Sequence, residues 1–271
     1  MADGEQHAAR ISLLGTVELA VPAGWCGGLP AQRRKVLALL AVNQGCPMSA
    51  EQMVNRLWEG EPPNSAAQMV RNQVNALRHL LAPSRGCVCN DHGGYRLSGQ
   101  VVIDAERFRT LVCQARSLRD TNMPLASISA LRGAQALWRG VEALADVRDV
   151  PDLELEAHGL EELRFQAEEM LSALYLDAGT PEAALPVLEE MTVRHPDREL
   201  PWVRLMVAQA LLSRRAEASN VTYRRAQHHL VEQTGLDAPM LDRVHLALLR
   251  GAEAAQLIAM SARGSAESAN R

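Results

Sequence analysis

The stretch of residues 49–81 constrains the fold more than any other, because it predicts two helices that cannot be continuous. Apolar residues at helical spacing indicate a short helix over residues 49–58 and a longer one over residues 64–81. The Glu-Gly-Glu-Pro-Pro sequence at 59–63 must separate them, since Gly and Pro both disfavour a helix interior. Ser65 and Gln68 have the spacing of a capping box at the start of the second helix.

The longer of these helices has an apolar side and an opposite side without acidic residues. At 100° per residue, one stripe contains Val70, Val74, Leu77 and Leu81. The opposite side and its border contain Ser65, Gln68, Arg71, Asn72, Asn75, Arg78 and His79. A solvated helix face usually mixes both signs of charge, whereas Asn, Gln and Arg suit base edges and phosphates. An ordinary polar face is the alternative, and the lack of Asp and Glu in residues 64–83 favours DNA binding.

Composition favours a mainly helical, cytoplasmic protein. The chain has 271 residues, enough for two domains, with 47% hydrophobic residues of which few are aromatic. A core of Leu, Val, Ala and Met is more typical of helices than of a β-sandwich. No apolar run is long enough to cross a membrane, and the first residues do not resemble a signal peptide. Five cysteines, an odd number without a secretory signal, indicate free thiols in a reducing compartment.

Charge and motifs narrow the functional classes. The net charge of −4 argues against a surface that is basic throughout, although basic residues are clustered locally in the N-terminal half. The sequence contains no nucleophile elbow, His-Glu-x-x-His helix, dinucleotide fingerprint or P-loop, which argues against an enzyme. Cys87, Cys89 and His92 could begin a zinc site, but a closed site needs four ligands, and only Cys113 is otherwise near in sequence. We therefore expect no metal and no cofactor.

The order of elements in the N-terminal half predicts a winged helix with an additional sheet. Two strands (10–15 and 17–21) and a helix (about 30–42) precede the helix pair, and two short strands (87–89 and 95–97) follow it. The last two strands read as a hairpin, the wing, because a Gly-containing loop joins them. We expect the wing, with His92, Tyr95 and Arg96, to lie beside the basic helix.

The second half predicts helical repeats. Asp104 can cap a helix over residues 105–118, a second helix is expected over 126–138, and apolar stripes at helical spacing continue to residue 250. Breaks near residues 179 and 215 recur at roughly the 34-residue period of tetratricopeptide repeats. The predicted organisation is a domain at 1–104, a helical domain at 105–250, and a tail at 251–271 that is expected to be disordered, since its sequence from Ser261 onward is small and polar.

Five segments of the chain occur in one order and spacing that is specific when taken together. They are Pro-Ala-Gln-Arg-Arg-Lys-Val-Leu-Ala-Leu-Leu at 30–40, Leu-Trp-Glu-Gly-Glu-Pro-Pro at 57–63, Val-Asn-Ala-Leu-Arg-His-Leu-Leu at 74–81, Gly-Tyr-Arg-Leu at 94–97 and Val-Ile-Asp-Ala-Glu-Arg-Phe at 102–108. In register, they resemble the Streptomyces antibiotic regulatory protein (SARP) family of transcriptional activators, in its small stand-alone form. Leu-Trp-Arg-Gly at 137–140 and Ala-Leu-Ala-Asp-Val at 143–147 resemble the activator domain of the same family.

The resemblance implies a fold and a function. It implies a response-regulator type of winged helix, whose third helix (64–81) enters the major groove and whose wing (87–97) contacts the minor groove. An all-α, tetratricopeptide-like bacterial transcriptional activator domain is expected to follow. The implied function is activation of an antibiotic biosynthetic gene cluster, by binding direct repeats near the −35 region as a dimer or tandem pair. The implied partners are double-stranded DNA and the RNA polymerase holoenzyme with its sigma factor.

These expectations assign roles to individual residues. The residues expected to read bases are Gln68, Arg71, Asn72 and Asn75. Those expected at phosphates or in the wing are Arg33, Arg34, Ser65, Arg78, His79, His92, Tyr95 and Arg96. The resemblance further implies that Glu59, Gly60 and Glu61 face the polymerase. The alternative function is a repeat-type adaptor whose winged helix binds protein rather than DNA.

Overall fold

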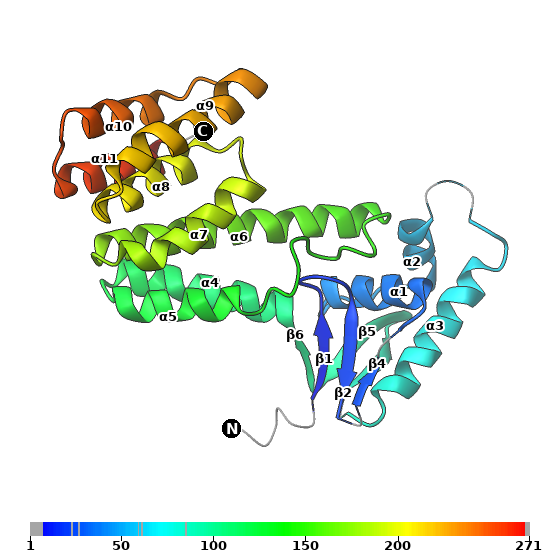
Figure 1. Cartoon of the computed structure of the whole chain (residues 1–271). Helices are drawn as coiled ribbons and strands as arrows, with labels where there is room; N and C mark the ends of the chain where they lie inside the picture. The colour runs from blue at the N-terminus through cyan, green and yellow to red at the C-terminus, as the bar shows by residue number, and fades with distance from the viewer. Residues whose placement is uncertain are drawn as a thin grey trace. The chain divides into compact units, whose positions relative to one another are not determined.

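The computed structural model describes residues 8–22, 24–26, 28–58, 60, 62–84 and 86–268, and it describes residues 24–26 and 263–268 by their backbone alone. The chain forms two compact units (Figure 1). The first comprises Met1–Gln114 and Gly133–Leu163, and the second comprises Ala115–Arg132 and Arg164–Arg271. Helices α4 (Asp104–Asp120), α5 (Pro124–Gln135) and α6 (Pro151–Asp177) therefore each contribute residues to both units.

The first unit begins with a four-stranded sheet. Its strands are β1 (Ala9–Ser12), β2 (Glu18–Val21), β3 (Gly24–Cys26) and β6 (Val101–Ile103), in the order β3-β2-β1-β6. Strand β1 pairs antiparallel with β2 and parallel with β6. Ile11 and Leu19 are opposite each other in this pairing, and both are buried, so one face of the sheet belongs to the core. The predicted first strand pair is confirmed.

Three helices pack together after this sheet. They are α1 (Ala31–Val42), α2 (Ala50–Leu57) and α3 (Ala66–Leu81). The predicted stripe of α3 is confirmed, because Val70, Val74, Leu77 and Leu81 are all fully buried. Burial of four aliphatic side chains on one face contributes on the order of 1.5–3 kcal/mol each, more than helix propensity alone provides.

The predicted capping box of α3 was wrong. Ser65 precedes α3 but makes no side-chain capping bond, because its backbone (φ −89°, ψ 1°) is not in the extended conformation of a capping residue. A capping box occurs instead at α2. The Ser49 hydroxyl accepts from the Gln52 amide at 3.1 Å, and the Gln52 side chain accepts from the Ser49 amide at 2.8 Å.

The wing is a two-stranded hairpin formed by β4 (Gly86–Asp91) and β5 (Gly94–Gly99). Its strands are longer than predicted because the loop has only two residues, His92 (φ 47°) and Gly93 (φ 82°). Two successive positive φ angles are typical of the tight turns whose twist matches that of paired strands. Tyr95 also forms an isolated antiparallel bridge with Met48, which anchors the wing to the segment before α2.

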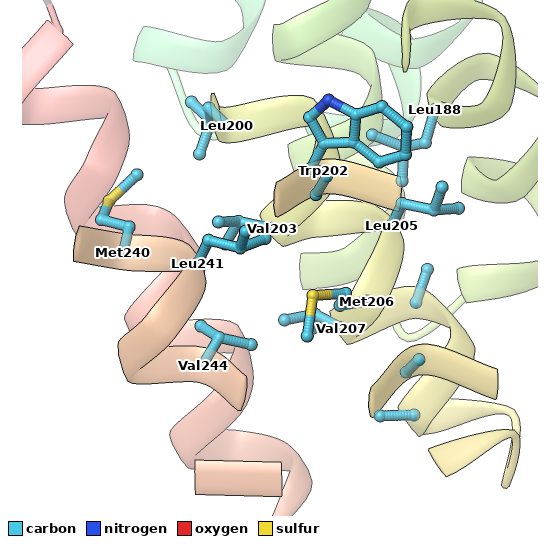
Figure 2. Packing of buried hydrophobic residues seen from close by; sticks show 14 of the residues in the cluster. Leu188, Leu200, Trp202, Val203, Leu205, Met206, Val207, Met240, Leu241 and Val244 are labelled. Carbon is cyan, nitrogen blue, oxygen red and sulfur yellow. The ribbon is translucent and has the colours of Figure 1, made fainter. Parts of the chain in front are cut away.

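The second unit is helical, and residues between 165 and 257 form a hydrophobic core within it. After α6 its elements are α7 (Pro181–Arg194), α8 (Glu199–Leu211), the π-helical segment η2 (Glu217–Thr222), α9 (Tyr223–Gln227), the π-helical segment η3 (His228–Gln233), α10 (Pro239–Leu249) and α11 (Ala254–Ser268). Gly179 and Ser213 have positive φ angles, at the two predicted breaks. Figure 2 shows the core around α8, where Val203 lies beside Leu241 of α10 and Trp202 is fully buried. The mainly α fold, with a small β region followed by helices, is confirmed.

The tail prediction was wrong for most of its length. Residues 251–271 were expected to be disordered, but residues Ala254–Ser268 form α11. Leu257 is buried in the same core as α8, and Ile258 and Met260 pack against that core. These few apolar residues order the helix because α8 offers them a surface, which sequence composition does not report. Among the described helices, none combines the length and the apolar character needed to cross a membrane.

Candidate nucleic-acid interface

The outer face of α3 presents the base-reading candidates to solvent. Gln68, Arg71, Asn72 and Asn75 are all exposed, as the helical phase predicted. Gln68 Nε2 donates to Asn72 Oδ1 at 3.0 Å, and Arg71 Nε donates to the carbonyl oxygen of Ala67 at 3.3 Å. These contacts lie within the helix and are local. The face therefore consists of amide and guanidinium groups on one rigid element, as base reading in a major groove requires.

Arg78 differs from the other basic residues of α3 because it joins the helix to the wing. Its Nε donates to the carbonyl oxygen of Val88 in β4 at 2.8 Å, and its Nη1 donates to Asn75 Oδ1 at 3.1 Å. Its guanidinium carbon lies 5.6 Å from the ring centroid of Tyr95 in β5. Arg78, predicted as a phosphate contact, thus connects α3 to the wing, and we call this connecting role a strut. His79, one residue on, is exposed and its Nδ1 lies 2.8 Å from the carbonyl oxygen of Asn75.

Two side chains of the wing lie close to the carboxylate of Asp91. Arg96 Nε lies 2.8 Å from Asp91 Oδ2, and His92 Nε2 lies 3.5 Å from Asp91 Oδ1. His92 is 95% exposed at the tip of the hairpin. The positive charge of Arg96 is therefore balanced within the wing by Asp91, and His92 lies beside the same carboxylate at the exposed tip of the hairpin.

The basic residues of α1 and α2 make contacts inside the first unit. Arg33 Nε donates to Gln73 of α3 at 3.1 Å. The other cations pair with three aspartates: Arg34 with Asp146 at 2.7 Å, Lys35 with Asp149, and Arg56 with Asp152 at 2.8 Å. Arg34 also donates to the carbonyl oxygen of Leu29 at 2.7 Å. Arg34, predicted at phosphates, is thus neutralised by Asp146.

These aspartates belong to a segment that we call the clamp segment, residues 139–152, which also bonds to the turn between β1 and β2. The amides of Arg139, Leu144 and Ala145 donate to backbone oxygens of residues 13–15 at 2.8–3.1 Å. Asp146 Oδ1 in turn accepts from the Val17 amide at 2.9 Å. Asp146 therefore holds both a cation of α1 and the start of β2.

Sequence reasoning missed this role of the clamp segment. The Leu-Trp-Arg-Gly motif at 137–140, which overlaps its start, and the Ala-Leu-Ala-Asp-Val motif at 143–147 were assigned to the helical half, whereas the structure includes them in the first unit. The sequence contains a signal for this role, because Asp146, Asp149 and Asp152 recur at every third position and are opposite in charge to the basic run at 33–35.

Asp104 was expected to cap α4 and has a further role. Its carboxylate accepts from the Leu13 amide at 2.7 Å and from the Leu14 amide at 3.2 Å, and so fixes the end of β1. Burial raises the pKa of Asp104, and these backbone hydrogen bonds act in the opposite direction. The residue thereby links β1 to the start of α4 within the first unit.

The two remaining predicted sites involve the loop and the thiols. In the polymerase-contact loop, Glu59 and Glu61 lie outside the described residues, and Gly60 has a φ of 95°. Cys87 and Cys89 are both free, with their Sγ atoms 3.1 Å apart. Within the described part of the chain, no three His, Cys, Asp or Glu side chains are grouped as metal ligands would be.

Comparison with known proteins places the chain among bacterial regulators. The family model described as the bacterial transcriptional activator domain matches residues 103–249. The regulatory protein AfsR of Streptomyces coelicolor is 31% identical over 86% of this chain, and the transcriptional regulator RedD of the same organism is 28% identical over 89%. The transcriptional regulatory protein EmbR of Mycobacterium tuberculosis is 29% identical over 88% of the chain.

The fold also matches a solved structure. EmbR of Mycobacterium tuberculosis in complex with a low-affinity phosphopeptide superposes with a TM-score of 0.80 at 26% identity, covering 97% of this chain and 71% of that one. The chain spans 23% of the length of AfsR and 62% of that of EmbR. EmbR and RedD are named as transcriptional regulators, and AfsR is named as a regulatory protein.

Proposed function

The chain belongs to the SARP family of transcriptional regulators, as its match to the bacterial transcriptional activator domain and its relatives show, and from this premise we propose that it is a sequence-specific DNA-binding activator. The observation that supports DNA binding most directly is the outer face of α3, which is exposed, rich in amides and basic groups, and free of acids over residues 64–83. Such a face suits the donor and acceptor pattern of a major groove.

In this proposal the contacts to DNA divide between two elements. Arg71 pairs with guanine, and Gln68, Asn72 and Asn75 read neighbouring base edges from the same helix. The wing contacts the minor groove, and His92 at its tip makes this contact. Phosphate contacts come from His79, Ser65 and Arg33 at the edges of α3 and α1. The internal pairing of Arg34, Arg78 and Arg96 supports positioning roles for these three residues.

The finer functional assignments are also part of the proposal. The protein activates an antibiotic biosynthetic gene cluster in the cytoplasm, binds direct repeats near the −35 region as a dimer or tandem pair, and recruits the RNA polymerase holoenzyme with its sigma factor. Glu59, Gly60 and Glu61 contact the polymerase. Residues 1–104 act as the DNA-binding domain and residues 105–250 as the activator domain. The similarity to AfsR and RedD, both Streptomyces regulators, supports the assignment to an antibiotic biosynthetic gene cluster.

The experiment that tests DNA binding is a selection of genomic promoter fragments by the purified full chain, followed by a footprint at two salt concentrations. We expect protected direct repeats, with affinity that decreases steeply as salt increases because phosphate contacts release counterions. A folded protein that selects no sequence, even at low salt, would instead favour the adaptor function, in which the winged helix binds protein.

A further inference from the structure

Strand β4 of the wing carries two thiols that the proposed DNA contacts do not use. Cys87 and Cys89 are two positions apart, so their side chains leave the strand on the same face. Their Sγ atoms are 3.1 Å apart, and both cysteines are free. Cys87 is exposed and Cys89 half-buried, so a small reagent can reach the pair.

The surroundings make the two thiols chemically unequal. The hydrogen bond with Cys87 lowers the pKa of the Cys89 thiol; burial opposes this effect, and a bond with Ser98 and the charges of Arg96 and Arg78 add to it. The same hydrogen bond raises the pKa of Cys87, and burial adds to this effect. Cys89 is therefore the one that ionises first. A thiolate beside a thiol within reach is the arrangement that allows one sulfur to react and the other to resolve the product.

We propose that Cys87 and Cys89 form a reversible oxidation site for hydroperoxides, and that its closure to a disulfide weakens operator binding. The oxidation itself depends only on the pair, whereas the effect on the operator rests on the proposed DNA-binding function.

The chemistry takes place in two balanced steps. The Cys89 thiolate attacks one oxygen of the hydroperoxide, the O–O bond breaks, and Cys89 becomes a sulfenic acid while hydroxide (or an alkoxide) leaves. The Cys87 sulfur then attacks the Cys89 sulfur, forming the S–S bond, and the displaced hydroxyl leaves as water with the Cys87 proton. Two sulfurs together lose two electrons to the peroxide. A dithiol reductant reverses the reaction by thiol–disulfide exchange.

The link to DNA binding is Val88, the residue between the two thiols. Its side chain is buried, and its carbonyl oxygen accepts the 2.8 Å bond from Arg78 Nε that joins the wing to α3. A disulfide requires the two sulfurs to approach to about 2 Å, which reshapes the backbone on both sides of Val88. Displacing this carbonyl removes a charge-assisted hydrogen bond and loosens the contact between the wing and α3, so we expect roughly tenfold weaker operator binding.

The first experiment measures the oxidation without DNA. The full chain is treated with hydrogen peroxide and digested, and the peptide containing both cysteines is weighed. We expect this peptide to lose the mass of two hydrogen atoms and to regain it with dithiothreitol. Cys46→Ser/Cys113→Ser, which removes two other exposed thiols, should behave like the wild type. If the peptide keeps both thiols or joins only to other cysteines, the proposal is overturned.

The roles of the two sulfurs are tested with dimedone, which labels sulfenic acids. In Cys87→Ser the sulfenic acid on Cys89 has no resolving thiol, so we expect peroxide-dependent labelling at Cys89. In Cys89→Ser we expect slower labelling at Cys87. Faster labelling of Cys87 would overturn the assignment of Cys89 as the attacking thiol.

The second experiment titrates the promoter fragment with reduced and oxidised protein. We expect the roughly tenfold loss for the wild type and for Cys46→Ser/Cys113→Ser, and no loss for Cys87→Ser or Cys89→Ser. Equal affinity of the oxidised and reduced wild type would overturn the effect on the operator. Failure of the reduced protein to bind any fragment would count against the proposed DNA-binding function, and the mass measurement would still decide the oxidation.

Discussion

Arg71 and Arg78 lie seven residues apart on α3, close to the same side of the helix, yet their neighbours give them different roles. Arg71 is exposed, and its Nε donates to the carbonyl oxygen of Ala67. This bond uses one of the five N–H donors of the guanidinium. Arg78 is half-buried, donates hydrogen bonds to Val88 and Asn75, and lies over the ring of Tyr95. Two arginines with the same sequence pattern are thus expected to act as a base reader and as a strut.

We expect Arg71→Ala to weaken operator binding by about 1–3 kcal/mol and to relax the preference at one base position, since a bidentate contact to guanine is lost. Arg107→Ala is a matched control, because it removes the same charge from an exposed position on α4. Affinity measured on a set of single-base operator variants tests this. A loss equal on all sequences would make Arg71 a phosphate contact.

Arg78→Lys distinguishes a structural role of Arg78 from a phosphate contact, because the variant keeps the charge and loses the planar donor group. We expect the free energy of unfolding of the first unit to decrease by about 1.5–3 kcal/mol, the range for a hydrogen bond to a charged group. Operator affinity should fall with it. Urea unfolding and promoter titration of the same protein measure both. Wild-type values in each assay would show that charge alone matters at this position.

At the scale of elements, the loop between α2 and α3 and the contact of α10 with α9 each make a separable prediction. The loop is bounded by two helices that are fixed by their own buried stripes, with Leu57 ending one and Ala66 beginning the other. Changes in its acidic residues should therefore disturb the core little. In the second unit, the His245 ring of α10 stacks on Tyr223 of α9 with centroids 3.7 Å apart.

We expect Glu59→Ala/Glu61→Ala to leave operator affinity unchanged and to reduce transcription, because the proposed loop contact is with polymerase and removing acids cannot weaken attraction to DNA. A promoter titration and a run-off assay on one template measure the two effects. Trp58 is kept intact, since its loss would confound activation with folding. Full transcription with normal binding would exclude the loop as the polymerase contact.

The second unit is expected to lose stability as the pH falls through the histidine range. Burial lowers the pKa of His245, although Asp242 opposes this effect, and its buried Nδ1 bonds to none of the described residues. The unfolded chain therefore binds the proton more readily, from a pKa of about 6.5, and the stabilisation present above that pKa is lost below it. His245→Phe should flatten the dependence of the unfolding free energy on pH. Identical slopes for variant and wild type would exclude His245 as a cause.

At the scale of the whole molecule, the clamp segment decides what a functional fragment must contain. It bonds to the β1–β2 turn and neutralises Arg34, Lys35 and Arg56, although its three aspartates follow these residues by more than ninety positions. The proposed domain boundary at residue 104 precedes this segment, so a fragment cut there lacks it.

We expect residues 1–105 to unfold at lower urea than residues 1–163 and to bind the operator more weakly. The physical reason is the loss of the bonds from Asp146 to Arg34 and to the Val17 amide. In the full chain, Asp146→Ala should cost about 1–3 kcal/mol of stability, because a partly buried amide and a cation lose their partner. Equal stability of the two fragments would show that the clamp segment is dispensable.

The sequence by itself determined the elements and the family. The stripe of α3, the wing and the helical second half follow from apolar periodicity and turn residues, which act over a few positions and can be read locally. The exposed side of α3 follows from the same phase, so Gln68, Arg71, Asn72 and Asn75 were placed correctly on the surface.

Only the tertiary structure decided which polar groups find partners and which apolar residues find a surface. Arg34 and Arg78 carry the same charge as Arg71, but Asp146 and Val88 reach them through chain segments that the fold brings close. Leu257 orders α11 for the same reason, because α8 lies beneath it. An ion pair or a buried contact depends on distances in space, and a one-dimensional pattern contains no distance between segments that are far apart in the chain.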